Sequence, residues 1–169
     1  DLQALTYYFE LWNETDLTNI FLANASISET TNTTSFEVNA GDEVPDGEYF
    51  WRVLSSDGID NSSNFTDKRN VTVDITVPLP IIDSPENITY NNETQDLNWT
   101  VVEDNRDSAW YTNDTGDTNY TLSDNSSQLI WIEGSNTVTL YINDSANNEN
   151  STSLTFNLDT LSPTISLLE

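Results

Sequence analysis

The chain has 169 residues with 29 acidic and only 4 basic side chains, which gives a formal net charge of −25. Such a charge repels nucleic-acid phosphates and anionic lipid, so we expect no nucleic-acid partner. The chain has no His and no Cys, which excludes imidazole bases, thiol nucleophiles, disulfides and nearly all zinc or copper sites. Leu, Ile, Val and Phe make up about a quarter of the residues, above the one-fifth typical of disordered chains, so we expect a folded core.

In chain order, the sequence predicts a series of short strands. Apolar and polar residues alternate in short runs, and clusters of Asn, Asp, Gly, Ser and Pro separate the runs. No window predicts a long amphipathic helix. The expected strands are 7–12, 35–38, 49–53, 80–82, 96–101, 129–132 and 137–142. This pattern indicates an all-β sandwich fold.

An internal repeat indicates two units. Segment 73–78 (VDITVP) matches segment 158–163 (LDTLSP). Gly47 is followed by Asp57 at the spacing that separates Gly134 from Asp144. A repeat of about 85 residues is the size of one immunoglobulin-like sandwich.

Two segments resemble known families. Residues 46–53 (DGEYFWRV), with the turn that follows, resemble the penultimate strand of fibronectin type III domains. That resemblance implies that Tyr49 is the tyrosine corner, whose hydroxyl bonds back to the chain. Residues 134–148 and the linker 158–163 resemble immunoglobulin-like repeats of archaeal and bacterial cell-surface glycoproteins. The second unit has Asn136 near the corner position, so the corner carries over only to the first unit.

We therefore expect an all-β chain of two tandem immunoglobulin-like or fibronectin III-like β-sandwiches, 1–77 and 78–160, with an overhanging strand at 161–169. The first sandwich lacks its N-terminal strands within this chain, because nothing before position 5 matches the first two strands of the second sandwich. Either the chain is a window of a longer tandem array, or a neighbouring copy donates the missing strand. The overhang is then the start of a further domain or a donor strand. Its expected assembly residues are Thr164, Ile165, Ser166, Leu167 and Leu168.

Fourteen of the 22 asparagines begin an Asn-x-Ser/Thr sequon. About five sequons would be expected by chance, and the triplet accepts N-linked glycan only on a chain that has crossed a membrane. The sequon asparagines are Asn13, Asn24, Asn32, Asn61, Asn64, Asn70, Asn87, Asn92, Asn98, Asn113, Asn119, Asn125, Asn143 and Asn150. Several sequons have an apolar middle residue, which we expect to face the core of a strand while the Asn faces solvent. These middle residues are Phe65, Val71, Ile88, Trp99 and Tyr120.

The sequons predict an extracellular, cell-surface location with N-linked glycans. Small secreted animal domains usually contain disulfides, so the absence of Cys favours a prokaryotic and, given the sequon density, an archaeal surface. The chain has no Met, so we expect a mature product or a piece of a longer protein. It has no apolar run of membrane-spanning length and no signal peptide, so an anchor is expected outside this segment.

Catalysis is not expected. The acids are too numerous for any carboxylate pair to indicate a glycosidase, and the five glycines form no phosphate-binding loop. No cofactor is required, but clustered Asp and Asn oxygens suit calcium. The alternative is that these side chains cap turns by bonding their own backbone. The candidate calcium ligands are Asp57, Asp60, Asn61, Asp74, Asp144, Asn147, Asn148 and Asp159.

Five tryptophans raise the question of sugar binding. Trp51 and Trp99 fall on predicted strands and are expected in the core, whereas Trp12, Trp110 and Trp131 are candidates for a surface platform.

The preferred function is a structural subunit of a glycosylated filament, sheath or S-layer, with copies of itself or flanking domains as partners. The alternative is a carbohydrate-binding or calcium-dependent adhesin module.

Overall fold

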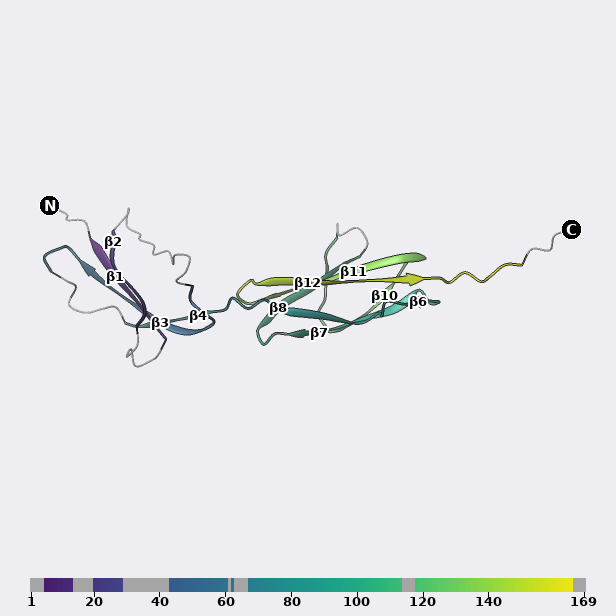
Figure 1. The fold of residues 1–169 in the computed structure, drawn as a ribbon, viewed down its shortest axis with the longest axis horizontal. Coiled ribbons are helices and arrows are strands. Elements are labelled where there is room, and N and C mark those ends of the chain that lie inside the picture. Colours follow the sequence, from purple (N-terminus) through teal and green to yellow (C-terminus); the bar gives the residue numbers. More distant parts are fainter. Residues whose placement is uncertain are drawn as a thin grey trace. The chain divides into compact units, whose positions relative to one another are not determined.

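A computed structural model describes residues 5–13, 20–28, 43–60, 62, 67–113 and 118–165. Every regular element in these ranges is a β-strand, which confirms the predicted all-β class. The chain divides into two compact units, Asp1–Ile75 (unit 1) and Thr76–Glu169 (unit 2), which can be followed in Figure 1 by the colour bar of residue numbers. This division lies two residues before the expected boundary.

The described part of unit 1 forms one antiparallel sheet with the order β2-β1-β3-β4. Its strands are β1 (Thr6–Trp12), β2 (Ile20–Ser28), β3 (Gly47–Ser56) and β4 (Arg69–Val73). The central pair, β1 and β3, runs in register from Thr6 opposite Ser56 to Trp12 opposite Phe50. The strand expected at 35–38 lies outside the described residues.

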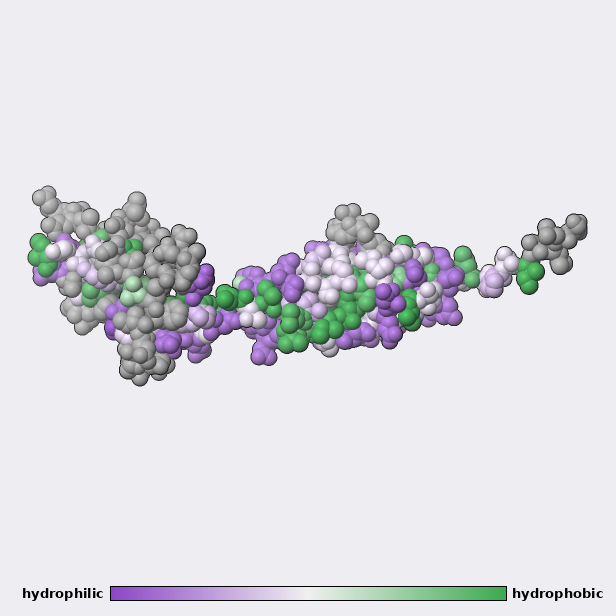
Figure 2. All heavy atoms as spheres, in the orientation of Figure 1, coloured by the Kyte–Doolittle hydropathy of each residue, from purple (hydrophilic) through white to green (hydrophobic). Residues whose placement is uncertain are grey.

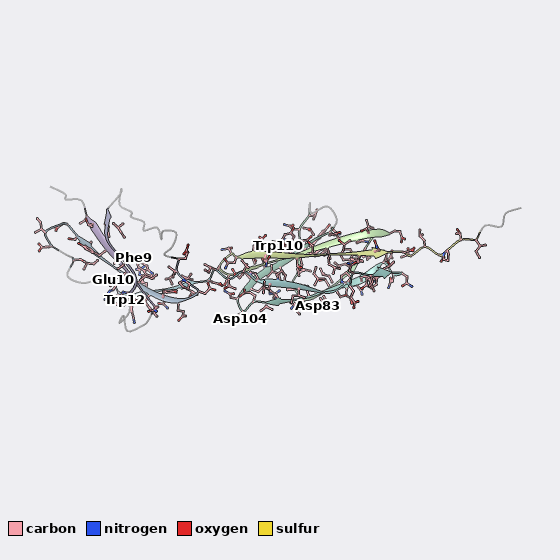
Figure 3. The ribbon with its side chains drawn as sticks, in the orientation of Figure 1. Phe9, Glu10, Trp12, Asp83, Asp104 and Trp110 are labelled. Carbon is pink, nitrogen blue, oxygen red and sulfur yellow. The ribbon has the colours of Figure 1, made fainter. Side chains whose placement is uncertain are left out.

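The two faces of the unit 1 sheet differ in chemistry. On one face the ring of Phe9 stacks on Trp51, with ring centroids 6.3 Å apart. On the other face Glu10 pairs with Arg52 at 2.6 Å, and the guanidinium of Arg52 lies 5.3 Å from the ring centroid of Trp12. Figure 3 labels Phe9, Glu10 and Trp12, which all lie on β1. The alternation follows from the two-residue period of a strand, which sends successive side chains to opposite faces.

Unit 2 is a sandwich of two sheets. One sheet has the order β10-β7-β5, and the other has the order β6-β12-β11-β8-β9. All neighbours are antiparallel except β6, which runs parallel to β12. The strands are β5 (Leu79–Ser84), β6 (Thr89–Tyr90), β7 (Thr94–Val102), β8 (Arg106–Asn113), β9 (Tyr120–Thr121), β10 (Ser126–Ile130), β11 (Gly134–Asp144) and β12 (Glu149–Leu158).

The core of unit 2 comes from strict alternation. Along β11 every second residue from Asn136 is buried and the intervening ones are half-buried. On the facing sheet Leu97 and Trp99 are buried, with Asn98 between them directed outward. The core consists of Leu97, Trp99, Ala109, Tyr111, Leu122, Trp131, Val138, Leu140, Ile142, Phe156 and Leu158.

The two units share a topology. The order β2-β1-β3-β4 of unit 1 repeats as β9-β8-β11-β12 in unit 2. Gly47 opens β3 opposite Val73, and Gly134 opens β11 opposite Leu158. The sequence repeat is therefore a structural repeat of the same strands. Unit 2 adds a second, three-stranded sheet, for which unit 1 has no counterpart among its described residues.

Several details differ from the sequence predictions. β10 ends at Ile130, so Trp131 and Ile132 lie beyond the strand expected at 129–132. β2, β8 and β12 were not predicted, although the segment Ala109-Trp110-Tyr111 of β8 carries a strand signal. Residues 161–165 form no strand, and the rest of the expected assembly strand lies outside the described residues.

Candidate functional site: turns, sequons and an aromatic pair

The tyrosine corner expected in unit 1 is present. The hydroxyl of Tyr49 donates a hydrogen bond to the carbonyl oxygen of Pro45 at 2.9 Å, and the ring is buried. In unit 2, Asn136 occupies the equivalent place, two residues after Gly134 and almost fully buried. Its Nδ2 donates to the carbonyl oxygens of Ile132 at 2.7 Å and Gly134 at 3.1 Å, and its Oδ1 accepts from the Ile132 N–H. An asparagine thus performs the loop closure that a tyrosine performs in unit 1.

A second repeated contact holds the segment that leaves each unit. In unit 1 the backbone N–H of Ile75 donates to Asp46 Oδ1 at 2.6 Å. In unit 2 the backbone N–H and the hydroxyl of Thr160 both donate to Glu133 Oε2, at 3.0 and 2.8 Å. Each acid directly precedes the glycine that opens β3 or β11, and each donor lies two residues beyond the last strand of its unit. We call these contacts the exit latches.

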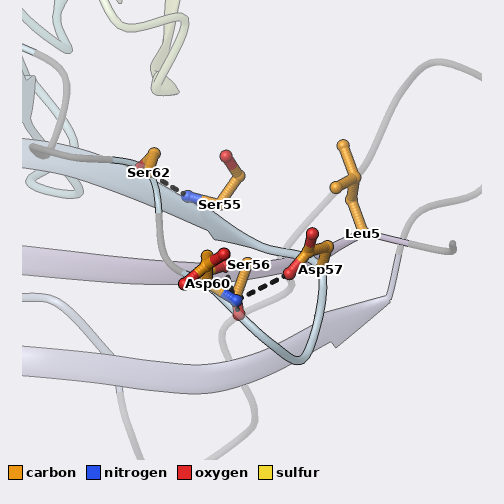
Figure 4. Close-up of a pocket in the computed structure, with 6 residues that line it drawn as sticks. All are labelled: Leu5, Ser55, Ser56, Asp57, Asp60 and Ser62. Atoms are coloured by element: carbon orange, nitrogen blue, oxygen red, sulfur yellow. Dashed lines mark hydrogen bonds between the residues drawn. The ribbon is translucent and has the colours of Figure 1, made fainter.

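Asp57 closes the turn after β3. Its Oδ1 accepts hydrogen bonds from the backbone N–H groups of Ile59 at 2.9 Å and Asp60 at 2.8 Å. These bonds hold the pKa of the Asp57 carboxyl below its usual value, because they stabilise the charged form. The turn lines a shallow pocket of about 230 Å³ (Figure 4). The pocket is lined by Leu5, Ser55, Ser56, Asp57, Asp60 and Ser62.

Asp144 closes the equivalent turn of unit 2. Its Oδ1 accepts from the N–H groups of Ala146 and Asn148, and its Oδ2 accepts from Asn148 Nδ2 at 2.8 Å. Asn147 within the turn has a positive φ of 68°, a conformation that asparagine tolerates. Burial acts to raise the pKa of the Asp144 carboxyl, but the hydrogen bonds outweigh it and leave the pKa lowered.

The candidate calcium ligands do not form a carboxylate cluster in the described ranges. No group of three or more acidic side chains there is placed to hold a metal ion. Asp57 and Asp144 use their oxygens to close turns, as the Asx-turn alternative expects. Asp159 Oδ1 likewise accepts the N–H of Leu161 at 3.2 Å. Asp74 is half-buried beyond β4, and Asn61 lies outside the described residues.

The sequon asparagines divide by exposure. Six of those described are exposed: Asn13, Asn70, Asn87, Asn92, Asn119 and Asn125. Four are half-buried: Asn98, Asn113, Asn143 and Asn150. Asn24 lies on β2, and Asn32, Asn61 and Asn64 lie outside the described residues. The accessible acceptors therefore occur in both units.

Two half-buried sequons differ in the state of the acceptor nitrogen. Asn98 points outward from the centre of β7, the middle strand of its sheet. In contrast, Nδ2 of Asn150 donates to the carbonyl oxygen of Pro78 at 2.9 Å. That nitrogen is the atom to which an N-linked glycan would be attached. The hydrogen bond to Pro78 would therefore hinder glycosylation of Asn150 in the folded unit.

We expected the apolar middle residues of five sequons to face a core. Trp99 does so, because it is buried in the core of unit 2. Val71, Ile88 and Tyr120 are instead 37%, 50% and 42% exposed. They lie on β4, before β6 and on β9, at the edges of their sheets. Phe65 lies outside the described residues.

Among the tryptophan candidates for a surface platform, only Trp110 is accessible. Trp12 and Trp131 are 6% and 4% exposed, and Trp131 belongs to the unit 2 core. Trp110 is half-buried on β8, and its ring lies parallel to that of Tyr141 with centroids 5.5 Å apart. Trp51, expected in the core, is half-buried.

Sequence reasoning missed the exit latches and the role of Asn136. The alignment of Gly47 with Gly134 could have shown both, because Asp46 and Glu133 are then equivalent acids and Tyr49 aligns with Asn136. No helix in the described ranges is long and apolar enough to cross a membrane.

No known family profile matches the chain, and no curated protein sequence matches it. Among solved structures, the fibronectin(III)-like modules of CbhA from Clostridium thermocellum align with 99% of this chain and 87% of that chain. The identity is 14% and the TM-score 0.47. The fold assignment rests on the strand order of the units themselves. On that order, the chain is an all-β protein of the immunoglobulin-like or fibronectin III-like sandwich type.

Proposed function

We propose that the chain is a structural part of a glycosylated assembly, such as a filament, sheath or S-layer, on the surface of a prokaryotic and specifically archaeal cell. The observation that carries the proposal is the exposure of sequon asparagines in both units. A glycan needs an acceptor that reaches solvent, and exposed turns and outward strand positions supply one. The strongly acidic composition adds a hydrated, mutually repelling surface.

Peptide mapping by mass spectrometry of the native protein tests the glycosylation. We expect added mass on peptides containing the exposed acceptors, for example Asn87 and Asn92. Asn147 and Asn157 are exposed but start no sequon, so they are matched controls that should carry no added mass. A native polypeptide of unmodified mass at every sequon would contradict the proposal.

For assembly, the proposed contact is the segment 161–169. Leu161 and Ile165 are 74% and 93% exposed, and the segment follows the Glu133 latch as residues 76–80 follow the Asp46 latch. Residues 76–80 lead into β5, the first strand of a sandwich. By this equivalence the segment supplies a strand to another sandwich, either in a neighbouring copy or in a flanking domain of the same chain.

Deletion of residues 162–169 tests this contact. We expect filaments or sheets visible by electron microscopy to be lost while the circular dichroism and unfolding of unit 2 stay unchanged. Replacement of residues 162–169 by a Gly/Ser segment of the same length should abolish assembly as well, which separates the loss of the contact from the change in chain length. Assemblies that persist after the longer deletion would show that the segment is not the contact.

A further inference from the structure

The outer face of the larger unit 2 sheet is chemically unlike the rest of this acidic protein. Its outward residues on β11 and β12 lie in directly opposite pairs: Thr137 with Thr155, Thr139 with Ser153, and Tyr141 with Ser151. The first two pairs are joined by hydroxyl–hydroxyl hydrogen bonds of 2.9 Å. In Figure 2 a pale area, neither strongly hydrophilic nor strongly hydrophobic, lies over β11 and β12. We call the outward side of β8, β11 and β12 the hydroxyl face.

Charge is nearly absent from the β11 and β12 part of the hydroxyl face, whereas β8 begins with the exposed Arg106 and Asp107. Along β11 and β12 the outward residues are Ser, Thr, Asn or Tyr, and the one exception is Glu149 at the end of β12. One-fifth of the whole chain is charged. The outward side of the opposite sheet differs, since it carries Asp83 and Asp96. Figure 3 labels Asp83 on this second sheet.

An aromatic pair lies within the hydroxyl face. Trp110 on β8 is directly opposite Tyr141 on β11, and the two ring planes are within 2° of parallel. Both side chains are half-buried, so each ring keeps part of its surface in solvent. Their mutual stacking restricts the rotamers of both rings, which lowers the entropy cost of binding a ligand against them.

The two sheets of unit 2 differ in where their outward sequons lie. Asn98 projects from the middle of the opposite sheet, where a glycan would cover the surface. On the hydroxyl face the nearest outward sequon is Asn143, at the end of β11, where its Oδ1 accepts a hydrogen bond from the Ser108 N–H. Asn143 is two residues from Tyr141 on the same side of β11 and lies opposite Ser108, so a glycan there would lie beside the aromatic pair.

We propose that the hydroxyl face binds an uncharged saccharide chain through Trp110 and Tyr141. Sugar rings present C–H faces suited to aromatic rings and hydroxyls suited to serine and threonine, which both donate and accept hydrogen bonds. An anionic ligand would be repelled by the net charge of −25. A second copy of the chain fits less well, because stable protein interfaces have an apolar centre and here two rings lie among hydroxyls. The proposal concerns the protein without a glycan at Asn143, because that residue lies two positions from Tyr141 on the same face.

Isothermal titration of the 169-residue chain with mannohexaose, cellohexaose and the hexamer of N-acetylglucosamine tests the proposal. We expect binding of at least one, weakened about tenfold by Trp110→Ala and by Tyr141→Ala. Because those rings are half-buried, Ser151→Glu is a second variant that places a charge beside Tyr141 at an exposed position. Ser126→Glu makes the same change on the exposed side of the opposite sheet and should leave binding unchanged.

Failure of all three saccharides to bind the unchanged protein would overturn the proposal. Binding that Trp110→Ala, Tyr141→Ala and Ser151→Glu leave unaltered would also overturn it. Analytical ultracentrifugation of the same variants tests whether the hydroxyl face is instead an interface between two copies of the chain. If the protein dimerises and these variants abolish the dimer without any saccharide binding, the hydroxyl face is an interface between copies and the proposal is wrong.

Discussion

The carbonyl oxygen of Ile132 accepts a hydrogen bond from Asn136 Nδ2 at 2.7 Å, across the four residues that lead into β11. Tyr49 reaches the carbonyl oxygen of Pro45, which also lies four residues earlier in the chain. The two side chains differ in size and chemistry but bond backbone carbonyls at equivalent positions. The corner is thus defined by the carbonyl that must be bonded rather than by the residue that bonds it.

Asn136→Ala should destabilise unit 2 by about 3 kcal/mol, because it removes the three hydrogen bonds that this almost fully buried side chain makes to the backbone. Tyr49→Phe removes a single hydrogen bond and should cost unit 1 about 1 kcal/mol. Urea unfolding followed by tryptophan fluorescence measures both. Equal losses for the two variants would contradict the view that Asn136 satisfies more than one backbone group.

Acid should weaken the Asp144 turn. The folded pKa of Asp144 lies below its unfolded value, so its contribution to stability is present above the unfolded pKa and is lost as pH falls through the folded one. Asp144→Asn removes this titration. The difference in unfolding free energy between the unchanged protein and Asp144→Asn should therefore shrink as pH is lowered from 7 toward 2. A difference that stays constant over this range would contradict the prediction.

Leu97→Ala should destabilise unit 2 by about 2–5 kcal/mol, because the residue is fully buried between the two sheets and its truncation leaves a cavity. Ile130→Ala is the matched control, since Ile130 is 75% exposed on the neighbouring strand β10, and it should change stability by less than about 0.5 kcal/mol. Thermal unfolding distinguishes the two. Similar losses of stability in the two variants would contradict the position of Leu97 in the core.

Gly134→Ala should cost about 1 kcal/mol, because its φ of 98° lies where side chains with a Cβ are disfavoured. A Cβ at this position would meet no atom within 4 Å, so the cost is conformational rather than steric crowding. Ser135→Ala at the next, exposed position of β11 is the control and should be nearly neutral. Unchanged stability of Gly134→Ala would show that the loop accommodates alanine by relaxing.

If the sequons are used, Asn150 should carry less glycan than Asn98. Its Nδ2 is held by the carbonyl oxygen of Pro78, whereas Asn98 faces outward. Quantitative peptide mapping of the native protein gives the occupancy of each site. Asn98→Gln should remove one glycan mass, and Asn150→Gln should remove none. Full occupancy of Asn150 would mean that the glycan is added before this contact forms.

The sequence predicted β11, in which apolar and polar residues alternate strictly, but not β12, whose inward positions are partly polar. Residues 137–142 became the centre of β11, since Val138, Leu140 and Ile142 face one core. The tyrosine corner was also predictable, because the DGEYFWRV segment carries a recognisable pattern. Trp131 was not, because a short apolar run does not show where its strand ends, and tertiary packing buried the residue beyond β10.

The candidate calcium ligands and the aromatic pair could not be settled from the sequence, because both depend on contacts that form only in the folded chain. Asp and Asn in a turn can bind a cation or bond their own N–H groups, and composition does not separate the two. The lowered pKa values of Asp57 and Asp144 come from such internal bonds. Pairing of Trp110 with Tyr141 required the register between β8 and β11, which no local pattern encodes.

The parallel contact between β6 and β12 has a mechanical consequence. The Asn157 N–H donates to the Ile88 carbonyl at 3.1 Å, and the Asp159 N–H donates to the Tyr90 carbonyl at 2.8 Å. Because the two strands run in the same direction, tension applied to the start of β6 and the end of β12 slides them past one another along their length. Both hydrogen bonds are then strained together in shear, instead of opening one after the other as in a zipper.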